Sequence, residues 1–469
     1  MSSLRWFNPA ALRGYFFAVG IAAVAVAQGV APVAGTMPED LLPELKPILL
    51  GALDRSPDTI RRGIEFEQAE AHTYLSRGAM LPNVAGYMRY ALNSASTASG
   101  NSNATSTSSG VFYALDVNQP VYHWGALKAQ AEIDQLAVKI AARQFAEMYR
   151  VLATMVRARF LELVAKKAAL RTASLQLKQA EMLLARDEQK LKDRALTPGD
   201  LVGPRLGIQE AQLGYDRAVA EFSYLKRVFT RLVGLAELAD DAIPADIPRP
   251  APAADRGEGL FRNFLRDGAA NTYVGQIFSF NIQQSDLNYR IAKTWLYPKF
   301  SAYAGYSVSN STQADFNQVR QEAIAQRYVG VLANWPIFDG RATTGRKLEA
   351  LGRKRANERQ LQTYVESTTD AAQNLQQQVG FAARALELAE TRFSLAQKGL
   401  EVTKENLAQG LASKDDVTNA TLDLQSRFAN PSGNDTINAR VNFLNRWVEF
   451  VSLVGADPAM NNLPPRYVR

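Results

Sequence analysis

The chain repeats itself over almost its whole length, with a constant spacing of 216 residues between matching positions. The matching blocks are Leu81–Val84 with Tyr297–Phe300, Asn118–Pro120 with Asn334–Pro336, and Thr197–Leu201 with Ser413–Val417. Three separate blocks with one spacing indicate two copies of the same structural unit. Any fold proposed for the chain must therefore build that unit twice.

The first 27 residues have the composition of a secretory signal peptide. Arg5 and Arg13 precede an apolar run that ends in Ala25-Val26-Ala27, which is the usual order of charge, apolar core and small residues. We expect cleavage after Ala27 and an N-terminal extension over 28–51. An N-terminal membrane anchor is the alternative, but the run is shorter than the ~20 residues that a spanning helix needs.

Each repeat contains two segments in which apolar and polar residues alternate, a pattern typical of β-strands. The expected strands are at about 82–92, 111–121, 299–309 and 326–337. Strands of about ten residues suit an outer-membrane barrel, and a hairpin of a soluble sandwich is the alternative. The side chains expected to face lipid are Val84, Met88, Val111, Leu115, Val329 and Val331. Arg89 and Asp116 fall on the opposite face, as expected for a wet barrel interior.

Each repeat also contains a helix longer than a compact domain can hold. From Leu361 to Leu407, apolar or small residues recur in alternating steps of four and three, which is a coiled-coil pattern. The expected helices, at about 124–193 and 339–409, would each be roughly 105 Å long at 1.5 Å per residue. In the first helix, charged residues at Arg159, Lys166 and Asp187 interrupt the pattern. They would face an aqueous tunnel or pair with a neighbouring helix.

Both long helices are expected to end at the same kind of turn. Thr197 with Asp200, and Ser413 with Asp416, fit the capping box, in which a hydroxyl and a carboxylate bind each other's backbone N–H groups. Return helices are expected at about 198–235 and 414–455, the second with a break near 430–434.

These elements divide the chain into two repeats with short flanking segments. Repeat 1 is expected at 52–237 and repeat 2 at 261–457. A Pro-rich linker over 238–260 joins them, and a C-terminal tail over 458–469 follows.

Composition excludes several classes of protein. The chain has no Cys and only two His, so it cannot build thiolate or multi-histidine metal sites. Its net charge of +7 falls to +5 once Arg5 and Arg13 are removed with the signal peptide, too small an excess to indicate nucleic-acid binding. No GxSxG, HExxH or phosphate-binding GxxxxGK[ST] motif is present. We expect no enzymatic activity, no catalytic residues, no cofactor and no metal.

Four strands cannot close a barrel, and unpaired strand edges are not tolerated in lipid. A membrane location therefore requires several chains, and the residues alone leave open whether two chains supply eight strands or three supply twelve.

The duplicated unit of two strands and a long helical hairpin resembles the TolC family of outer-membrane efflux and secretion channels. The resemblance covers about residues 41–458 and includes Leu81-Pro82 before the first strand, Pro120 and Pro336 after later strands, and the turn Gly410–Val417. It implies a mainly α fold with a transmembrane β-barrel portion, in which a homotrimer forms a twelve-stranded barrel in the outer membrane and an α-helical tunnel through the periplasm.

The resemblance also implies a function. The trimer would be the passive exit duct of a tripartite efflux pump or a type I secretion system, in contact with outer-membrane lipid and gated at the hairpin tips. It would dock to a periplasmic adaptor, a membrane fusion protein, and through it to an inner-membrane pump. A non-conducting periplasmic coiled-coil scaffold, resembling an adaptor, is the alternative.

The residues that the resemblance assigns to the hairpin tips fall into two groups. Those expected to dock the adaptor are Arg194, Ala195, Thr197, Asp200, Gly410, Leu411, Ser413 and Asp416. Asp415 and Asp416 are expected at the pore constriction, although acids at a helix start also complement the helix dipole. Arg194 stands where the second repeat has Gly410, a departure that bears on docking rather than architecture.

Overall fold

The computed structural model describes residues 37–99, 102–251, 254–315, 318–429 and 435–468. The expected signal peptide, part of the N-terminal extension and the expected break at 430–434 lie outside these residues. Among the described residues, no helix is both long and apolar enough to cross a membrane.

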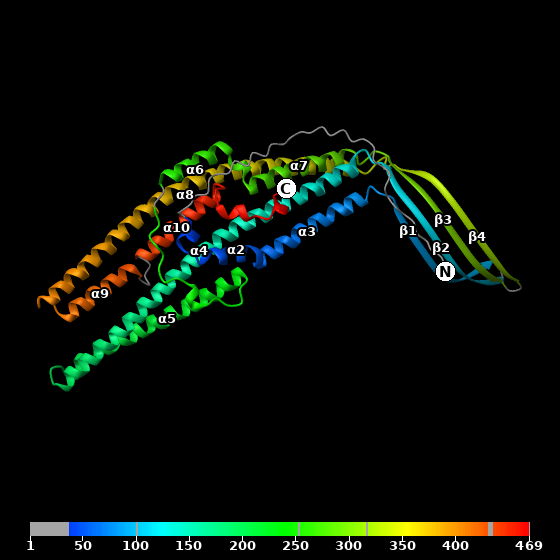
Figure 1. The fold of residues 1–469 in the computed structure, drawn as a ribbon. Helices are drawn as coiled ribbons and strands as arrows, with labels where there is room; N and C mark the ends of the chain where they lie inside the picture. The colour runs from blue at the N-terminus through cyan, green and yellow to red at the C-terminus, as the bar shows by residue number, and fades with distance from the viewer. Residues whose placement is uncertain (1–36, 100–101, 252–253, 316–317, 430–434, 469) are drawn as a thin grey trace, which may run out of the picture. The chain divides into compact units, whose positions relative to one another are not determined.

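The elements follow one another in two matching series (Figure 1). The first consists of α3 (Pro57–Gly78), β1 (Asn83–Ser99), β2 (Ser102–Tyr122), α4 (Ala126–Lys192), the short 3₁₀ helix η1 (Pro198–Leu201) and α5 (Val202–Val233). The second consists of α7 (Tyr273–Lys293), β3 (Lys299–Asp315), β4 (Gln318–Asn334), α8 (Ala342–Ala408), α9 (Lys414–Phe428) and α10 (Thr436–Leu453). From α3 and α7 through to α4 and α8, matching elements begin 216 residues apart, the spacing of the sequence repeat.

The strands extend further than the alternation of apolar residues predicts. The segment 93–110 consists of Ser, Asn, Thr, Ala and Gly, yet β1 and β2 continue through most of it in register from Asn83↔Asn118 to Ser99↔Ser102. Backbone pairing between neighbouring strands needs no apolar side chains, so the ladder continues where the hydrophobic pattern stops. Together the strands form one antiparallel sheet in the order β1-β2-β3-β4.

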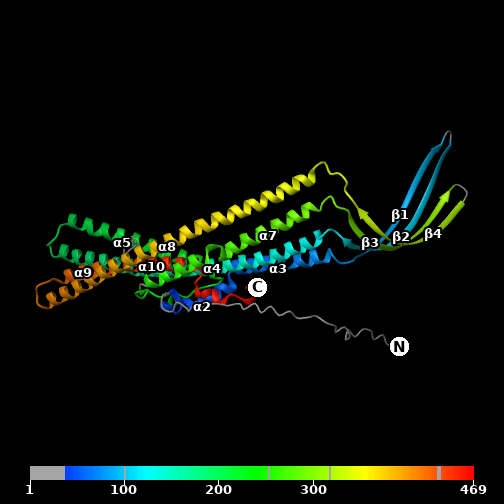
Figure 2. The ribbon, with the colours of Figure 1, turned by 90° about the horizontal axis from the view of Figure 1, so that it is seen from above.

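The long helices α4 and α8 have 67 residues each, which corresponds to about 100 Å at 1.5 Å per residue. Both α3 and α5 pack on α4, while α7, α9 and α10 pack on α8. Figures 1 and 2 show α3 and α5 following one another along α4, with the sheet beyond one end of the long helices and their hairpin turns at the other. Because α7 and α10 also contact α4, the two repeats pack directly against each other.

The segment between the repeats is ordered and partly helical. Ile243 and Ile247 are buried in the main hydrophobic core, close to the short 3₁₀ helix η2 (Asp240–Ala242). Helix α6 (Ala254–Asp267) begins inside the predicted linker, ends inside the predicted second repeat and packs on α8. Prolines that exclude a long helix still allow short elements to cover the core.

Both ends of the described chain pack on α4. The N-terminal helices α1 (Pro38–Leu41) and α2 (Leu45–Arg55) contact it, as do η4 (Pro458–Asn462) and η5 (Pro465–Tyr467) of the C-terminal tail. The Tyr467 ring stacks on Phe145 with centroids 3.6 Å apart and meets the edge of Phe66 at 5.0 Å. The tail is therefore an integral part of the helical packing.

Candidate functional site

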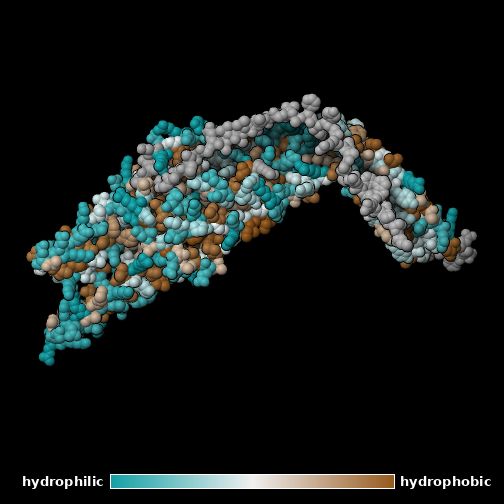
Figure 3. Space-filling view, viewed as in Figure 1, coloured by the Kyte–Doolittle hydropathy of each residue, from teal (hydrophilic) through white to brown (hydrophobic). Residues whose placement is uncertain are grey.

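One face of the sheet carries a continuous apolar surface. In an antiparallel sheet, directly paired residues point to the same face. The register joins Val84, Val117, Ala304 and Val329 in one row across all four strands. It places all six residues predicted to face lipid, Val84, Met88, Val111, Leu115, Val329 and Val331, on this face, which we call the apolar belt. Apolar side chains remain visible on the strands in the space-filling view (Figure 3).

The height of the apolar belt matches a membrane. Along β3 it runs from Phe300 to Val308, and it reaches Tyr90 on β1 and Val111 on β2, which pair with each other. Ten residues of strand rise about 33 Å, or about 25 Å in height at the ~40° tilt usual for such strands, which is the thickness of an outer-membrane apolar band. Arg327 lies within the belt, 5.9 Å from the ring centre of Tyr306. Its long side chain can carry the charge towards an interface.

Aromatic residues gather where the strands meet the helices. Trp124 lies 4.9 Å from Tyr122 and 5.0 Å from Tyr297, measured between ring centroids. The indole N–H of Trp124 donates to the carbonyl of Pro298, and that of Trp335 to the carbonyl of Leu296. Rings with an apolar body and a satisfied polar edge suit the boundary between lipid and water. Of these residues, sequence reasoning singled out only Trp335, because the others lie just outside the alternating segments.

The sheet has two open edges. In the order β1-β2-β3-β4, the described strands β1 and β4 each have a neighbour on one side only. Each edge strand has 17 residues, so a long row of backbone N–H and C=O groups faces outward. In lipid such groups must pair with another strand, which makes the single chain an incomplete membrane structure.

At the far end of the long helices, the two hairpin tips share one backbone solution. Arg194 and Gly410, at matching repeat positions, both have positive φ values, 58° and 75°. The residues that follow close the turns, because the N–H of Ala195 donates to Lys190 at 2.8 Å and that of Leu411 to Asn406 at 2.7 Å. The departure noted in the sequence therefore leaves the turn itself unchanged.

The capping boxes predicted at both tips are present. The Asp200 carboxylate accepts from the backbone N–H and the hydroxyl of Thr197, each at 2.7 Å. The Asp416 carboxylate accepts in the same way from Ser413, at 2.8 and 2.7 Å. These hydrogen bonds, chiefly those from the backbone N–H groups, lower the pKa of both carboxyls below the usual 3.8.

The structure gives Asp415 a different partner. Its carboxylate forms an ion pair with Arg186 of α4 at 2.5 Å. Arg186 belongs to the first hairpin and Asp415 to the second, so this contact joins the two tips of one chain. Arg186 also contacts Asp187, at 3.3 Å. Both partners of the 186–415 pair are largely exposed, and such pairs contribute at most about 1 kcal/mol.

The other charged interruptions of the first long helix also have partners. Arg159 pairs with Glu162 one turn further along α4, at 2.8 Å. Lys166 pairs with Glu221 of α5, at 2.7 Å. Of the two alternatives left open by the sequence, pairing with a neighbouring helix thus describes Lys166.

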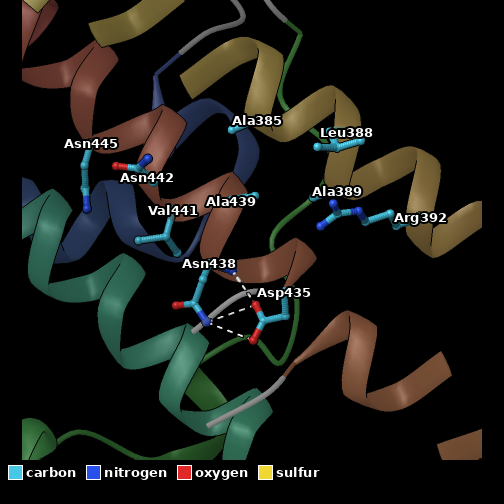
Figure 4. Close-up of a pocket in the computed structure, with 10 residues that line it drawn as sticks. All are labelled: Ala385, Leu388, Ala389, Arg392, Asp435, Asn438, Ala439, Val441, Asn442 and Asn445. Atoms are coloured by element: carbon cyan, nitrogen blue, oxygen red, sulfur yellow. Dashed lines mark hydrogen bonds between the residues drawn. The ribbon is translucent and has the colours of Figure 1, made fainter. Parts of the chain in front are cut away.

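A groove of about 640 Å³ separates parts of α8 and α10 (Figure 4). Asn438, Asn442 and Asn445 line it from α10, and Arg392 lines it from α8. The amide of Asn438 donates to both carboxylate oxygens of Asp435, the residue that caps α10. Amides and one guanidinium offer a polar surface without a nucleophile. Among the described residues, no group of His, Asp and Glu has the arrangement of a metal site.

Two buried arginines, which the sequence pattern did not reveal, fix the helices near their middle. Arg157, fully buried on α4, binds Glu39 through two hydrogen bonds of 2.9 and 2.6 Å and Asp457 through two of 2.7 and 3.0 Å. Arg440 on α10 binds Glu390 of α8 and Asp246 of the segment between the repeats. Both read in the sequence as ordinary charged positions of a helix.

Comparison with known proteins identifies this arrangement. Residues 278–455 match the family model described as "Outer membrane efflux protein". The resemblance to the TolC family is confirmed. The matched segment covers α8, the second hairpin tip and most of the second repeat. No curated protein matches the chain by sequence.

Solved structures of TolC-family channels share the fold of the whole chain. The outer membrane channel CmeC of Campylobacter jejuni aligns with a TM-score of 0.65 and 12% identity, over 98% of each chain. The outer membrane protein VceC of Vibrio cholerae aligns at 0.59 and 14%, over 91% of this chain and 98% of that one. The MtrE outer membrane channel of Neisseria gonorrhoeae aligns at 0.59 and 15%, over 88% and 89%. The chain is a non-enzymatic outer-membrane channel protein with a large periplasmic portion.

Proposed function

We propose that three copies of the chain form a passive exit duct of a tripartite efflux pump or a type I secretion system. The observation that carries this proposal is the four-stranded sheet with an apolar belt on one face and an open edge on either side. Three such sheets joined edge to edge supply twelve strands, the number that the TolC resemblance implies. Closure would satisfy the backbone edges and place the apolar belt against lipid.

The helices would continue the duct below the membrane. In one chain, α4 has neighbours on both sides, whereas α8 lies at an edge of the helical layer and buries far fewer residues. Exposed apolar residues remain on α8, among them Phe381, Leu388 and Leu395. In a ring, α8 of one copy would pack against α3 and α5 of the next.

The hairpin tips would form the gate and the docking site for a periplasmic adaptor. The Arg186–Asp415 pair supports the gate, because it ties the two tips together through a contact weak enough to open and close. For docking, Leu411 supports the second tip as a contact surface, since 76% of this apolar side chain is exposed. The adaptor would connect the duct to an inner-membrane pump that supplies the energy.

Mass, shape and conductance together test the proposal. We expect the detergent-extracted protein to have the mass of a trimer by light scattering and a particle longer than 100 Å in negative stain, as the helix lengths require. Reconstituted in planar bilayers, it should conduct ions. A detergent-independent monomer without conductance would contradict the duct and favour a periplasmic coiled-coil scaffold.

A further inference from the structure

The face of the sheet opposite the apolar belt carries a cluster of two tyrosines, two glycines and one aspartate. Tyr303 of β3 pairs with Gly330 of β4, and Gly305 pairs with Tyr328 in the next row of that face. On its other side, Gly305 pairs with Asp116 of β2. The five residues thus form one compact patch across three neighbouring strands.

The glycines allow both rings to lie flat against the strands. A Cβ atom at Gly305 would lie 2.4 Å from the Tyr328 ring, and one at Gly330 would lie 2.7 Å from the Tyr303 hydroxyl. Those distances are closer than carbon atoms approach, so any larger residue would push the rings away from the sheet. The two ring centroids are 6.2 Å apart, and 38% of each tyrosine remains exposed. The patch therefore presents two aromatic surfaces away from the sheet.

Beside these rings lies a carboxylate that can attract a cation. The Tyr328 hydroxyl donates a hydrogen bond to Asp116 across Gly305, which fixes the carboxylate next to the ring. The register puts Arg89 and Lys299 on the same face, but their charged groups lie over other rings, Arg89 over Phe112 at 5.9 Å and Lys299 over Trp295 at 4.6 Å. Asp116 thus keeps its negative charge available beside the two tyrosines.

We propose that this patch is a binding site for organic ammonium ions on the interior wall of the duct. Aromatic faces attract cations through their ring quadrupole, and a neighbouring carboxylate adds charge complementarity. The inference rests on the proposed function, because the patch faces the interior only if the sheets close with the apolar belt outside. A trimer would carry three such patches at one level, so cationic cargo would be retained there during passage.

Block of ionic current by tetraethylammonium chloride tests this inference in planar bilayers. The blocker is added on the side of the strand hairpins, from which it reaches the patch without passing the helical tips. We expect Asp116→Asn to raise the half-blocking concentration about fivefold to tenfold, which corresponds to about 1 kcal/mol, the usual size of such interactions. Tyr328→Ala should raise it similarly, while Tyr328→Phe, which keeps the ring, should change it less than twofold.

Two further variants separate the patch from general effects on the sheet. Gly305→Ala should weaken the block while the channel still conducts, because the added methyl group displaces the Tyr328 ring. Tyr306→Phe, on the opposite face of the same strand, should leave the block unchanged. A conducting wild type that is not blocked, or is blocked equally in every variant, would overturn this inference and leave the duct standing. A wild type that forms trimers but does not conduct would overturn the duct, and this inference with it.

Discussion

Arg157 and Asp457, 300 residues apart in the chain, form a fully buried ion pair in which two guanidinium N–H groups meet two carboxylate oxygens. The Nε and Nη2 groups of the same guanidinium bind Glu39, so one side chain on α4 holds both the N-terminal segment and the C-terminal tail. Burial alone disfavours the charged guanidinium, but the two carboxylates more than offset this and raise the pKa of Arg157.

Loss of Arg157 should therefore destabilise the protein strongly. Arg157→Met leaves Glu39 and Asp457 with uncompensated charge in the core, and we expect a loss of about 3–5 kcal/mol in the free energy of unfolding. Urea denaturation followed by circular dichroism measures this loss. Arg159→Met, which removes only an exposed pair with Glu162, is the matched control and should cost less than about 1 kcal/mol. Equal losses in the two variants would contradict the bridging role of Arg157.

The sequence predicts the fold to the extent that patterns repeat locally. The 216-residue spacing, the alternation in the strands and the coiled-coil pattern each depend on neighbouring residues, and the matching helices α4 and α8 begin with that spacing. The extension of β1 and β2 through 93–110 could not be predicted from hydrophobic alternation, since backbone pairing alone continues the ladder there. Prolines in the segment between the repeats likewise concealed the helix α6.

The candidate site was predictable only in part, for the same reason. Capping boxes join residues three apart, and strand faces follow from a period of two, so both are legible in sequence. The partners of Arg157 lie 118 and 300 residues away, and Arg186 lies 229 residues from Asp415. Contacts of this kind are set by how the two repeats pack, which no local pattern records.

A charge on the apolar belt should impair membrane assembly. Leu115 lies near the middle of the belt, where a lysine costs about 2–4 kcal/mol against lipid. We expect Leu115→Lys to reduce the amount of assembled oligomer in the outer-membrane fraction, measured by its mobility on unheated gels. Ala114→Lys, one residue away on the opposite face, should assemble normally. Normal assembly of Leu115→Lys would count heavily against a lipid-facing belt.

The tip latch should control conductance. Asp415→Ala removes the partner of Arg186 and leaves the capping box of Ser413 and Asp416 intact. We expect a larger single-channel conductance in planar bilayers, because the two hairpins of each chain are then free to separate. Arg186→Ala should have the same effect, and the double variant should add nothing further. An unchanged current in both single variants would remove this pair from the gate.

The capped tips should resist mild acid. Asp200 and Asp416 have lowered pKa values in the folded state, so the stability they contribute is complete above the unfolded value of 3.8 and is lost as the pH falls through the folded values. Hydrogen-exchange protection of the amides near 197–201 and 413–417 should thus be the same at pH 7 and pH 5 and decrease only below pH 3.8. Asp416→Asn should weaken protection at the second tip at every pH. A loss of protection between pH 7 and pH 5 would show that another group controls the tips.

Adaptor docking should depend on the turn at Gly410. Its φ of 75° disfavours any residue with a Cβ, and no atom lies within 4 Å of the position that a Cβ would occupy, so a substitution acts through backbone strain of about 1–2 kcal/mol. We expect Gly410→Val to displace the exposed Leu411 and to reduce cross-linking between Lys414 and a periplasmic adaptor several-fold. Arg194→Gly relieves the same conformation at the first tip, where φ is 58°, and should keep cross-linking at the wild-type level. Undiminished cross-linking of Gly410→Val would exclude this turn from the docking surface, because the valine alters the one tip conformation that both repeats share.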